Sequence, residues 1–240
     1  MYVRSVAPHH LSFRRVILVN FRIPTATMKN LYCISGLGAD ERIFCKLSIK
    51  GIRLIHLPWM PFDKNDELPG YAQKMAAMVD EEEPMMLGLS FGGMLVTEIA
   101  RSRKLKRAFL VSSAKGKHEL PQLNGALQYL IRREMLPYTF LKTPNRLLFD
   151  YMGATTEEEK QLLSAIVRDA NPAFMRWALK ALVNWQRTSS PEQIIHIHGT
   201  KDKILKPDFI KADHWIEGGT HMMIYNRASE ISALISQYLD

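Results

Sequence analysis

The chain has 240 residues, 47% of them hydrophobic and 23% charged, and it contains no apolar run near the ~20 residues that a membrane-spanning helix requires. Five basic residues without an acidic neighbour lie within residues 1–29 and account for most of the formal net charge of +8, so we expect no nucleic-acid partner for the remainder. Two cysteines, Cys33 and Cys45, are too few for a disulfide framework, which favours a reducing, cytoplasmic location.

Residues 1–27 precede the first clear strand, and we expect them to form a poorly ordered or non-native N-terminal extension. Their short apolar run at 16–19 is interrupted by Asn20 and Arg22 before it reaches the length of a signal-peptide core. Met28 stands directly before the first strand, so we expect translation to begin there in the natural protein.

Short apolar strands alternate with amphipathic helices between residues 28 and 114. The pattern predicts strands at 31–34, 52–57, 84–89 and 107–111, and helices at 71–79 and 91–100. Such alternation is typical of an α/β fold, in which helices flank both faces of a mostly parallel sheet.

The rhythm changes between residues 115 and 190, where helical stretches at 123–135, 156–169 and 172–186 follow one another without a strand. This segment is expected to be an inserted helical cap. Two strands at 193–198 and 214–216 and a helix at 224–239 then return to the first pattern. The core is therefore expected to comprise residues 28–114 and 191–240.

The segment Gly88-Leu89-Ser90-Phe91-Gly92-Gly93 matches the pattern G-x-S-x-G between a predicted strand and a predicted helix. A sharp strand-to-helix turn with small residues on either side would present the serine hydroxyl above the sheet. Alone the pattern also fits a glycine-rich turn with a serine cap. The histidine, carboxylate and oxyanion-loop candidates described next favour a nucleophile at Ser90 over this alternative.

A serine hydroxyl needs a base to accept its proton, and His221 is the best candidate among eight histidines. It lies in the loop after the last predicted strand, at the carboxyl end of the sheet where Ser90 also emerges. His196 and His198 share one face of a strand, but no third ligand stands at metal-binding spacing, so we expect hydrogen-bonded sheet histidines. No metal or cofactor is expected.

A carboxylate must hold the imidazole in one tautomer and stabilise its positive charge, and Asp202 fits this role. It follows the strand at 193–198 through a Gly-Thr-Lys-Asp loop, which could also be an ordinary turn. Asp208 and Asp213 are rival candidates that follow a strand end less directly.

The intermediate formed on Ser90 would need two main-chain N–H donors for its oxyanion. Phe91 supplies one, directly after the serine. The loop Ser35-Gly36-Leu37-Gly38 supplies the second, which we assign to the N–H of Leu37, although the same residues could form a plain β-turn.

These four segments, in this order, resemble the α/β-hydrolase superfamily over residues 30–240. The resemblance implies the α/β-hydrolase fold, a Ser90–His221–Asp202 triad and a cap above the site. Ser35 stands where the family often has histidine, and the two strands that usually precede this loop are missing or reduced to residues 16–20, so a shortened sheet is expected. A serine at position 90 disfavours the members with an aspartate nucleophile, the haloalkane dehalogenases and epoxide hydrolases.

The expected reaction is cleavage of an ester-like bond in a small, apolar substrate through an acyl-enzyme. The same groups could cleave a thioester, an amide or a carbon–carbon bond, and a ligand-binding protein without catalysis is a further alternative. The expected partner is a small molecule, and the sequence indicates no oligomeric state.

Overall fold

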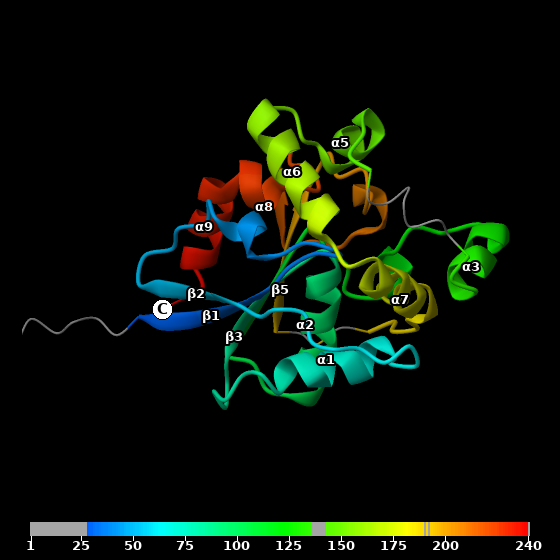
Figure 1. Cartoon of the computed structure of the whole chain (residues 1–240). Coiled ribbons are helices and arrows are strands. Elements are labelled where there is room, and N and C mark those ends of the chain that lie inside the picture. The colour runs from blue at the N-terminus through cyan, green and yellow to red at the C-terminus, as the bar shows by residue number, and fades with distance from the viewer. Residues whose placement is uncertain (1–27, 136–142, 190, 192, 240) are drawn as a thin grey trace, which may run out of the picture.

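The computed structural model describes residues 28–135, 143–189, 191 and 193–239 (Figure 1). The expected extension at 1–27 therefore lies outside the described residues. Six parallel strands form one sheet in the order β2-β1-β3-β4-β5-β6. The strands are β1 (Lys29–Ile34), β2 (Ile52–His56), β3 (Met85–Leu89), β4 (Arg107–Val111), β5 (Ile194–Gly199) and β6 (His214–Ile216).

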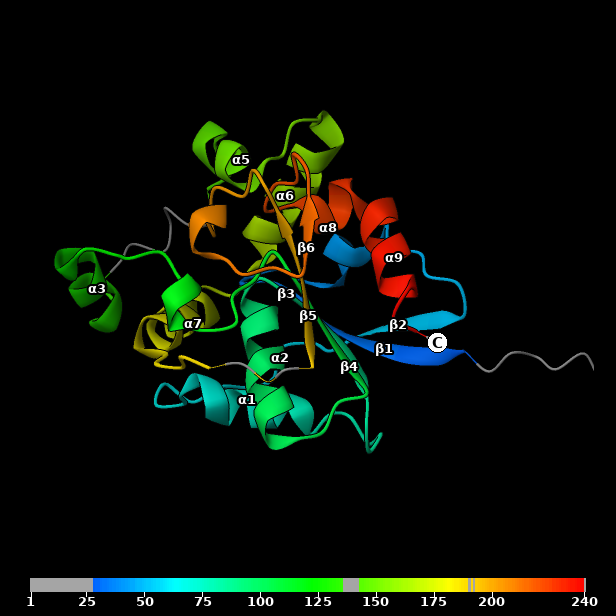
Figure 2. The ribbon, with the colours of Figure 1, turned by 180° about the vertical axis from the view of Figure 1, so that it is seen from behind.

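The four central strands β1, β3, β4 and β5 are mostly buried because helices cover both faces of the sheet (Figures 1 and 2). On one face lie α1 (Leu68–Ala76) and α2 (Phe91–Ser102), and on the other lie α8 (Met223–Asn226), α9 (Ala228–Ser236) and the 3-10 helix η1 (Glu41–Phe44). In β1, Tyr32 and Ile34 join the first core, whereas Leu31 and Cys33 join the second. The alternation of side chains along a strand thus supplies both cores, which confirms the expected α/β fold.

Between β4 and β5, the described residues include the α-helices α3 (Gly125–Arg132), α5 (Arg146–Met152), α6 (Glu157–Asp169) and α7 (Pro172–Asn184). Thr156 begins α6 in a capping box with Glu159, and Asn171 caps α7 ahead of a first-turn proline. The short helix α5 was not predicted, because its seven residues are too few to show a helical period; none of them is fully buried, although Leu148, Phe149 and Met152 pack against the second core. In Figure 2, α3 stands at the edge of the molecule.

The helix expected at 224–239 is wrong as a single element. The chain leaves the helical region at Arg227, where φ is −122° and ψ is 28°, and this residue separates α8 from α9. The 3-10 helix η2 (Lys117–Glu119) lies at the start of the insertion, and η3 (Pro207–Phe209) lies between β5 and β6. None of the described helices has both the length and the apolar composition needed to cross a bilayer.

Candidate active site

Ser90 occupies a strained turn between β3 and α2, with φ of 50° and ψ of −118°. Positive φ is uncommon for a residue with a side chain, so the surrounding structure must impose it. A Cβ on Gly92 would lie 2.3 Å from the carbonyl oxygen of Ile34, and one on Gly88 would lie 2.4 Å from Cα of Gly93. Only glycine permits these approaches, which explains the small residues around the serine.

Two hydrogen bonds, to β4 and to the residues after it, hold this turn. The N–H of Ser90 donates to the carbonyl of Val111 at 3.0 Å, and Oγ of Ser113 donates to the carbonyl of Ser90 at 2.6 Å. A Cβ on Gly93 would lie 2.3 Å from Oγ of Ser113. Ser113 was not predicted, because in the sequence it is only a serine that follows a buried strand.

His221 lies between the serine and the carboxylate. Its Nε2 is 3.0 Å from Oγ of Ser90, and its Nδ1 is 2.8 Å from Oδ2 of Asp202. His221 is buried, whereas Ser90 is half-buried. Since the carboxylate only accepts hydrogen bonds, Nδ1 carries the proton, and Nε2 of the neutral ring can accept one from the serine.

Asp202 is buried, and two main-chain N–H groups and two histidines stabilise its carboxylate. Its Oδ1 accepts the N–H groups of Ile204 at 2.8 Å and Leu205 at 2.9 Å, which leaves Oδ2 for His221. Burial by itself raises the pKa of this carboxyl, but the charge and hydrogen bond of His221, the Leu205 N–H and the charge of His198 bring the pKa below its ordinary value. The group therefore stays ionised at neutral pH.

The expected oxyanion donors border the same space. A β-turn, closed by the N–H of Ala39 on the carbonyl of Gly36 at 2.9 Å, contains Leu37 and Gly38 at its centre. A Cβ on Gly36 would lie 3.4 Å from Cβ of Ser90. Within the described part of the chain, the N–H of Leu37 has no hydrogen-bond acceptor, and the N–H of Phe91 begins α2 and has none within that helix. Both groups are available to a ligand.

The rival acids lie elsewhere. Asp213 accepts the main-chain N–H of His196 at 2.7 Å, and Asp208 is an exposed residue of η3. Among the described residues, neither makes a hydrogen bond or an ion pair with His221, and Asp202 is its carboxylate partner.

The histidines of β5 differ from expectation in part. His198 donates through Nε2 to the carbonyl of Leu205 at 2.9 Å, as expected of a hydrogen-bonded sheet histidine. His196 is fully buried; its ring nitrogens make no hydrogen bond of good geometry among the described residues, but the main chain of Ser113 and Lys211 lies close enough to interact with the ring. Over those same residues, no three His, Cys, Asp or Glu side chains are grouped as metal ligands.

Helix α5 and the residue after it contact the loops that carry Asp202 and His221. The N–H of Met222 donates to the carbonyl of Met152 at 3.0 Å, and a Cβ on Gly153 would lie 2.3 Å from Cβ of Thr220. Lys203, one residue after Asp202, pairs with Asp150 at 2.6 Å.

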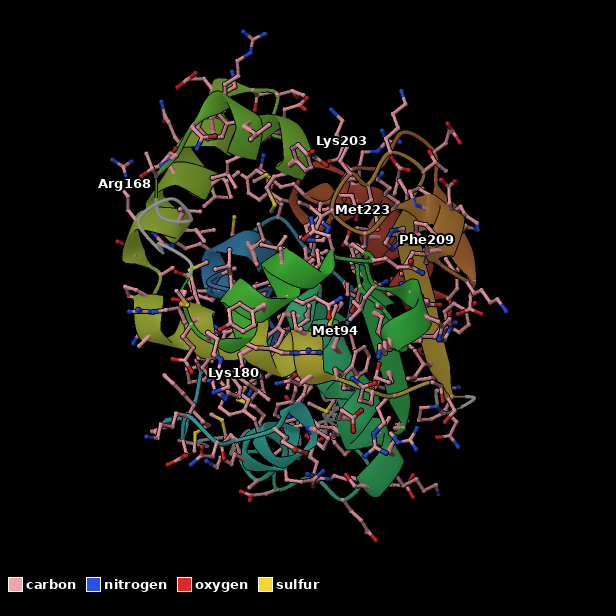
Figure 3. All side chains as sticks on the ribbon, turned by 90° about the vertical axis from the view of Figure 1, so that its right-hand side faces the viewer. Met94, Arg168, Lys180, Lys203, Phe209 and Met223 are labelled. Atoms are coloured by element: carbon pink, nitrogen blue, oxygen red, sulfur yellow. The ribbon has the colours of Figure 1, made fainter. Side chains whose placement is uncertain are left out.

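Figure 3 shows Lys203 and Phe209 on the right of the insertion, opposite Arg168 of α6 and Lys180 of α7.

An aromatic cluster surrounds Phe91. The ring of Trp59 lies 6.0 Å from that of Phe91 and 4.7 Å from that of Phe174, which comes from α7. A cavity of about 400 Å³ adjoins this cluster and the oxyanion turn. Its lining comprises Gly38, Ala39, Asp40, Trp59, Met60, Pro61, Phe62, Asp169, Ala170, Asn171 and Phe174.

Comparison with solved structures places the chain in the α/β-hydrolase fold. A thermophilic esterase from Thermogutta terrifontis matches with a TM-score of 0.67 at 14% identity, over 89% of this chain and 90% of that chain. A putative lipase from Acinetobacter baumannii matches with a TM-score of 0.64 at 16% identity, over 89% and 84%. The N-acyl homoserine lactonase AidH, complexed with N-hexanoyl homoserine, matches with 0.63 at 16%, over 88% of each chain.

No protein-family model and no curated protein matches the sequence. At these identities the likeness is one of fold. The chain thus has the α/β-hydrolase fold, with a parallel six-stranded sheet and a helical insertion between β4 and β5.

Proposed function

We propose that the protein is a serine hydrolase that cleaves an ester-like bond through an acyl-enzyme. The observation that carries the proposal is the continuous contact from Oγ of Ser90 through the imidazole of His221 to the carboxylate of Asp202, at 3.0 and 2.8 Å. These distances lie within hydrogen-bonding reach, as nucleophile and base require.

In the first half-reaction, Oγ of Ser90 attacks the carbonyl carbon of the substrate while Nε2 of His221 takes the hydroxyl proton. The N–H groups of Leu37 and Phe91 stabilise the negative oxygen of the tetrahedral intermediate. The intermediate collapses to the acyl-enzyme as His221 returns the proton to the leaving alcohol. Water then attacks the acyl group by the same route, which releases the acid and restores Ser90. Asp202 remains ionised throughout and stabilises the imidazolium.

The substrate is proposed to be small and apolar. Trp59, Phe62 and Phe174 line the cavity beside the oxyanion turn, and aromatic walls favour an apolar group. The similar structures include proteins named as an esterase, a putative lipase and a lactonase, and these names denote cleavage of ester bonds. They support an ester substrate over an amide, a thioester or a carbon–carbon bond. We further propose that residues 115–190 are the cap of this site, because α5 and α7 contact its loops.

The proposal is tested with a fluorophosphonate probe and a series of p-nitrophenyl esters of increasing acyl length. The wild-type protein should be labelled at Ser90 and hydrolyse one or more of the esters. Ser90→Ala should abolish labelling and lower kcat/KM by several powers of ten, with thermal unfolding unchanged.

Ser236→Ala is the matched control, since the hydroxyl of Ser236 bonds only within α9, to the carbonyl of Ser232 at 2.8 Å. It should retain wild-type activity. A folded wild-type protein that neither reacts with the probe nor turns over any ester would instead favour a ligand-binding role.

A further inference from the structure

The carbonyl oxygen of Ala39, at the end of the oxyanion turn, accepts two side-chain hydrogen bonds. Oγ of Ser35 donates at 2.7 Å, and Nε1 of Trp59 donates at 2.9 Å. Ser35 is fully buried at the end of β1, whereas Trp59 comes from the connection between β2 and α1. Both lone pairs of the carbonyl are thereby occupied by groups from different segments.

His56 extends this arrangement to the end of β2. Its Nε2 lies 3.4 Å from Oγ of Ser35. Because the hydroxyl hydrogen of Ser35 is directed to Ala39, the serine oxygen can only accept at this contact, and Nε2 must carry the hydrogen. The ends of two neighbouring strands and one loop thus fix the hydroxyl that holds the turn.

The same turn is fixed on its other sides. Gly38 has a φ of +72°, and a Cβ there would lie 3.2 Å from Cβ of Ala170 and 3.3 Å from Sδ of Met175. Gly36 packs against Ser90, as described above. Leu37 lies between these two glycines, so the direction of its N–H is set once the Ala39 end of the turn is held.

We propose that Ser35 and Trp59 are positioning residues of the oxyanion hole, acting through the Ala39 carbonyl on the N–H of Leu37. This inference rests on the proposed function. It gives a role to Ser35, which stands where the fold family often has histidine. The hydroxyl of Ser35 reaches the Ala39 carbonyl directly from the end of β1, and the indole of Trp59, from the β2–α1 connection, donates the second hydrogen bond to the same carbonyl.

The double variant Ser35→Ala/Trp59→Phe removes both donors and keeps an aromatic ring at position 59, where Trp59 packs on Phe91 and Phe174. A donor displaced from the developing charge loses transition-state stabilisation selectively, so kcat should fall roughly 10- to 100-fold while KM stays within about twofold. The affinity for phenylboronic acid, which forms a tetrahedral adduct with the serine, should fall by a similar factor.

Tyr71→Phe is the matched control. The hydroxyl of Tyr71 donates to the carbonyl of Met60 at 2.8 Å in the same β2–α1 connection, and not to a residue of the oxyanion turn. It should lose stability without losing phenylboronic acid affinity. If Tyr71→Phe weakens kcat and boronate affinity as much as the double variant, the two donors act through general stability and the inference is overturned.

The failure of this inference can be separated from the failure of the proposed function. If Ser90→Ala is inactive but the folded double variant keeps wild-type kcat and boronate affinity, only the positioning role is refuted. If Ser90→Ala is active, the proposed function itself fails. Should Ser35→Ala prevent folding, Trp59→Phe alone decides, with an expected fall in kcat of about 3- to 10-fold and an unchanged KM.

Discussion

Gly199 and Gly219 meet backbone to backbone: a Cβ on Gly199 would lie 2.3 Å from the carbonyl oxygen of Gly219. This carbonyl also accepts the N–H of Lys201 at 2.8 Å. The contact brings the loop that carries Asp202 against the loop that carries His221. The hydrogen bond between these two side chains therefore depends on the absence of a side chain at position 199.

Gly199→Ala should destabilise the protein by about 1–3 kcal/mol, because the added methyl group must push the two loops apart. We also expect kcat to fall at least about tenfold, since Asp202 and His221 would separate. Urea unfolding and ester turnover measure the two effects. Gly70→Ala is the control, because a Cβ there meets no atom within 4 Å, and alanine at this helical position should be neutral or stabilising. Wild-type activity in Gly199→Ala would contradict the role of this contact.

Asp202→Asn should lower kcat by roughly 10³- to 10⁴-fold with little effect on KM, because an amide can present a donor to the imidazole and reverse its tautomer. The amide oxygen can still accept the N–H groups of Ile204 and Leu205, so the loop should persist. Steady-state kinetics and circular dichroism together check this. Asp208→Asn removes the exposed rival carboxylate and should leave kcat unchanged. If Asp208→Asn lowered kcat more than Asp202→Asn does, Asp208 would be the carboxylate that supports His221.

Stability should decrease as the pH falls below about 6.5, because burial lowers the pKa of His196 to about 3 and also lowers the pKa values of His56 and His198. In this range the unfolded chain binds protons that the folded chain does not, and each such histidine contributes up to about 1.4 kcal/mol per pH unit. Above the pKa that these histidines have in the unfolded chain, neither state binds the extra protons, and the unfolding free energy no longer depends on pH through them.

The free energy of unfolding in urea, measured between pH 5 and pH 8, tests this directly. His196→Leu should flatten the dependence of the unfolding free energy on pH below pH 6.5. An unchanged slope in His196→Leu would rule out His196 as a source of the acid sensitivity.

Glu98 of α2 should anchor the end of the insertion to the core. This buried carboxylate accepts Nε1 of Trp185 at 2.7 Å and Nε of Arg187 at 3.2 Å. Glu98→Leu leaves the buried indole N–H unpaired and should cost about 2–3 kcal/mol, whereas Glu98→Gln keeps an acceptor and should cost about 1 kcal/mol. Equal losses in urea unfolding would show that the indole bond contributes nothing measurable.

Much of the fold was predictable because buried parallel strands are continuous apolar runs. The segments at β3 and β4 are of this kind, and glycine or proline marks where several elements end. The fold class and the helical insertion followed from the order of these runs. Short elements were less accessible: α5 has too few residues to show a helical period, and the break at Arg227 arises from a local backbone conformation without a proline or glycine.

The candidate site followed from motifs that have local causes. Gly88 packs against Gly93 within the turn, and Gly92 and Gly93 leave room for Ile34 and Ser113, so the requirement for small residues around Ser90 is written in one short stretch of sequence that could be recognised. Contacts made across the molecule left no such trace. Ser113, Trp59 and the glycine pair 199 and 219 act on residues distant along the chain, and each resembles an ordinary loop residue until the chain is folded.

The sequence by itself determined the alternation of strands and helices, the turn that strains Ser90 and the order of the serine, acid and histidine loops, since backbone sterics and side-chain periodicity act over a few residues. Only the tertiary structure decided which carboxylate reaches His221 and what holds the oxyanion turn. Those outcomes depend on distances between segments more than 100 residues apart, such as Ser90 and His221, which the packing of the sheet and its two cores sets.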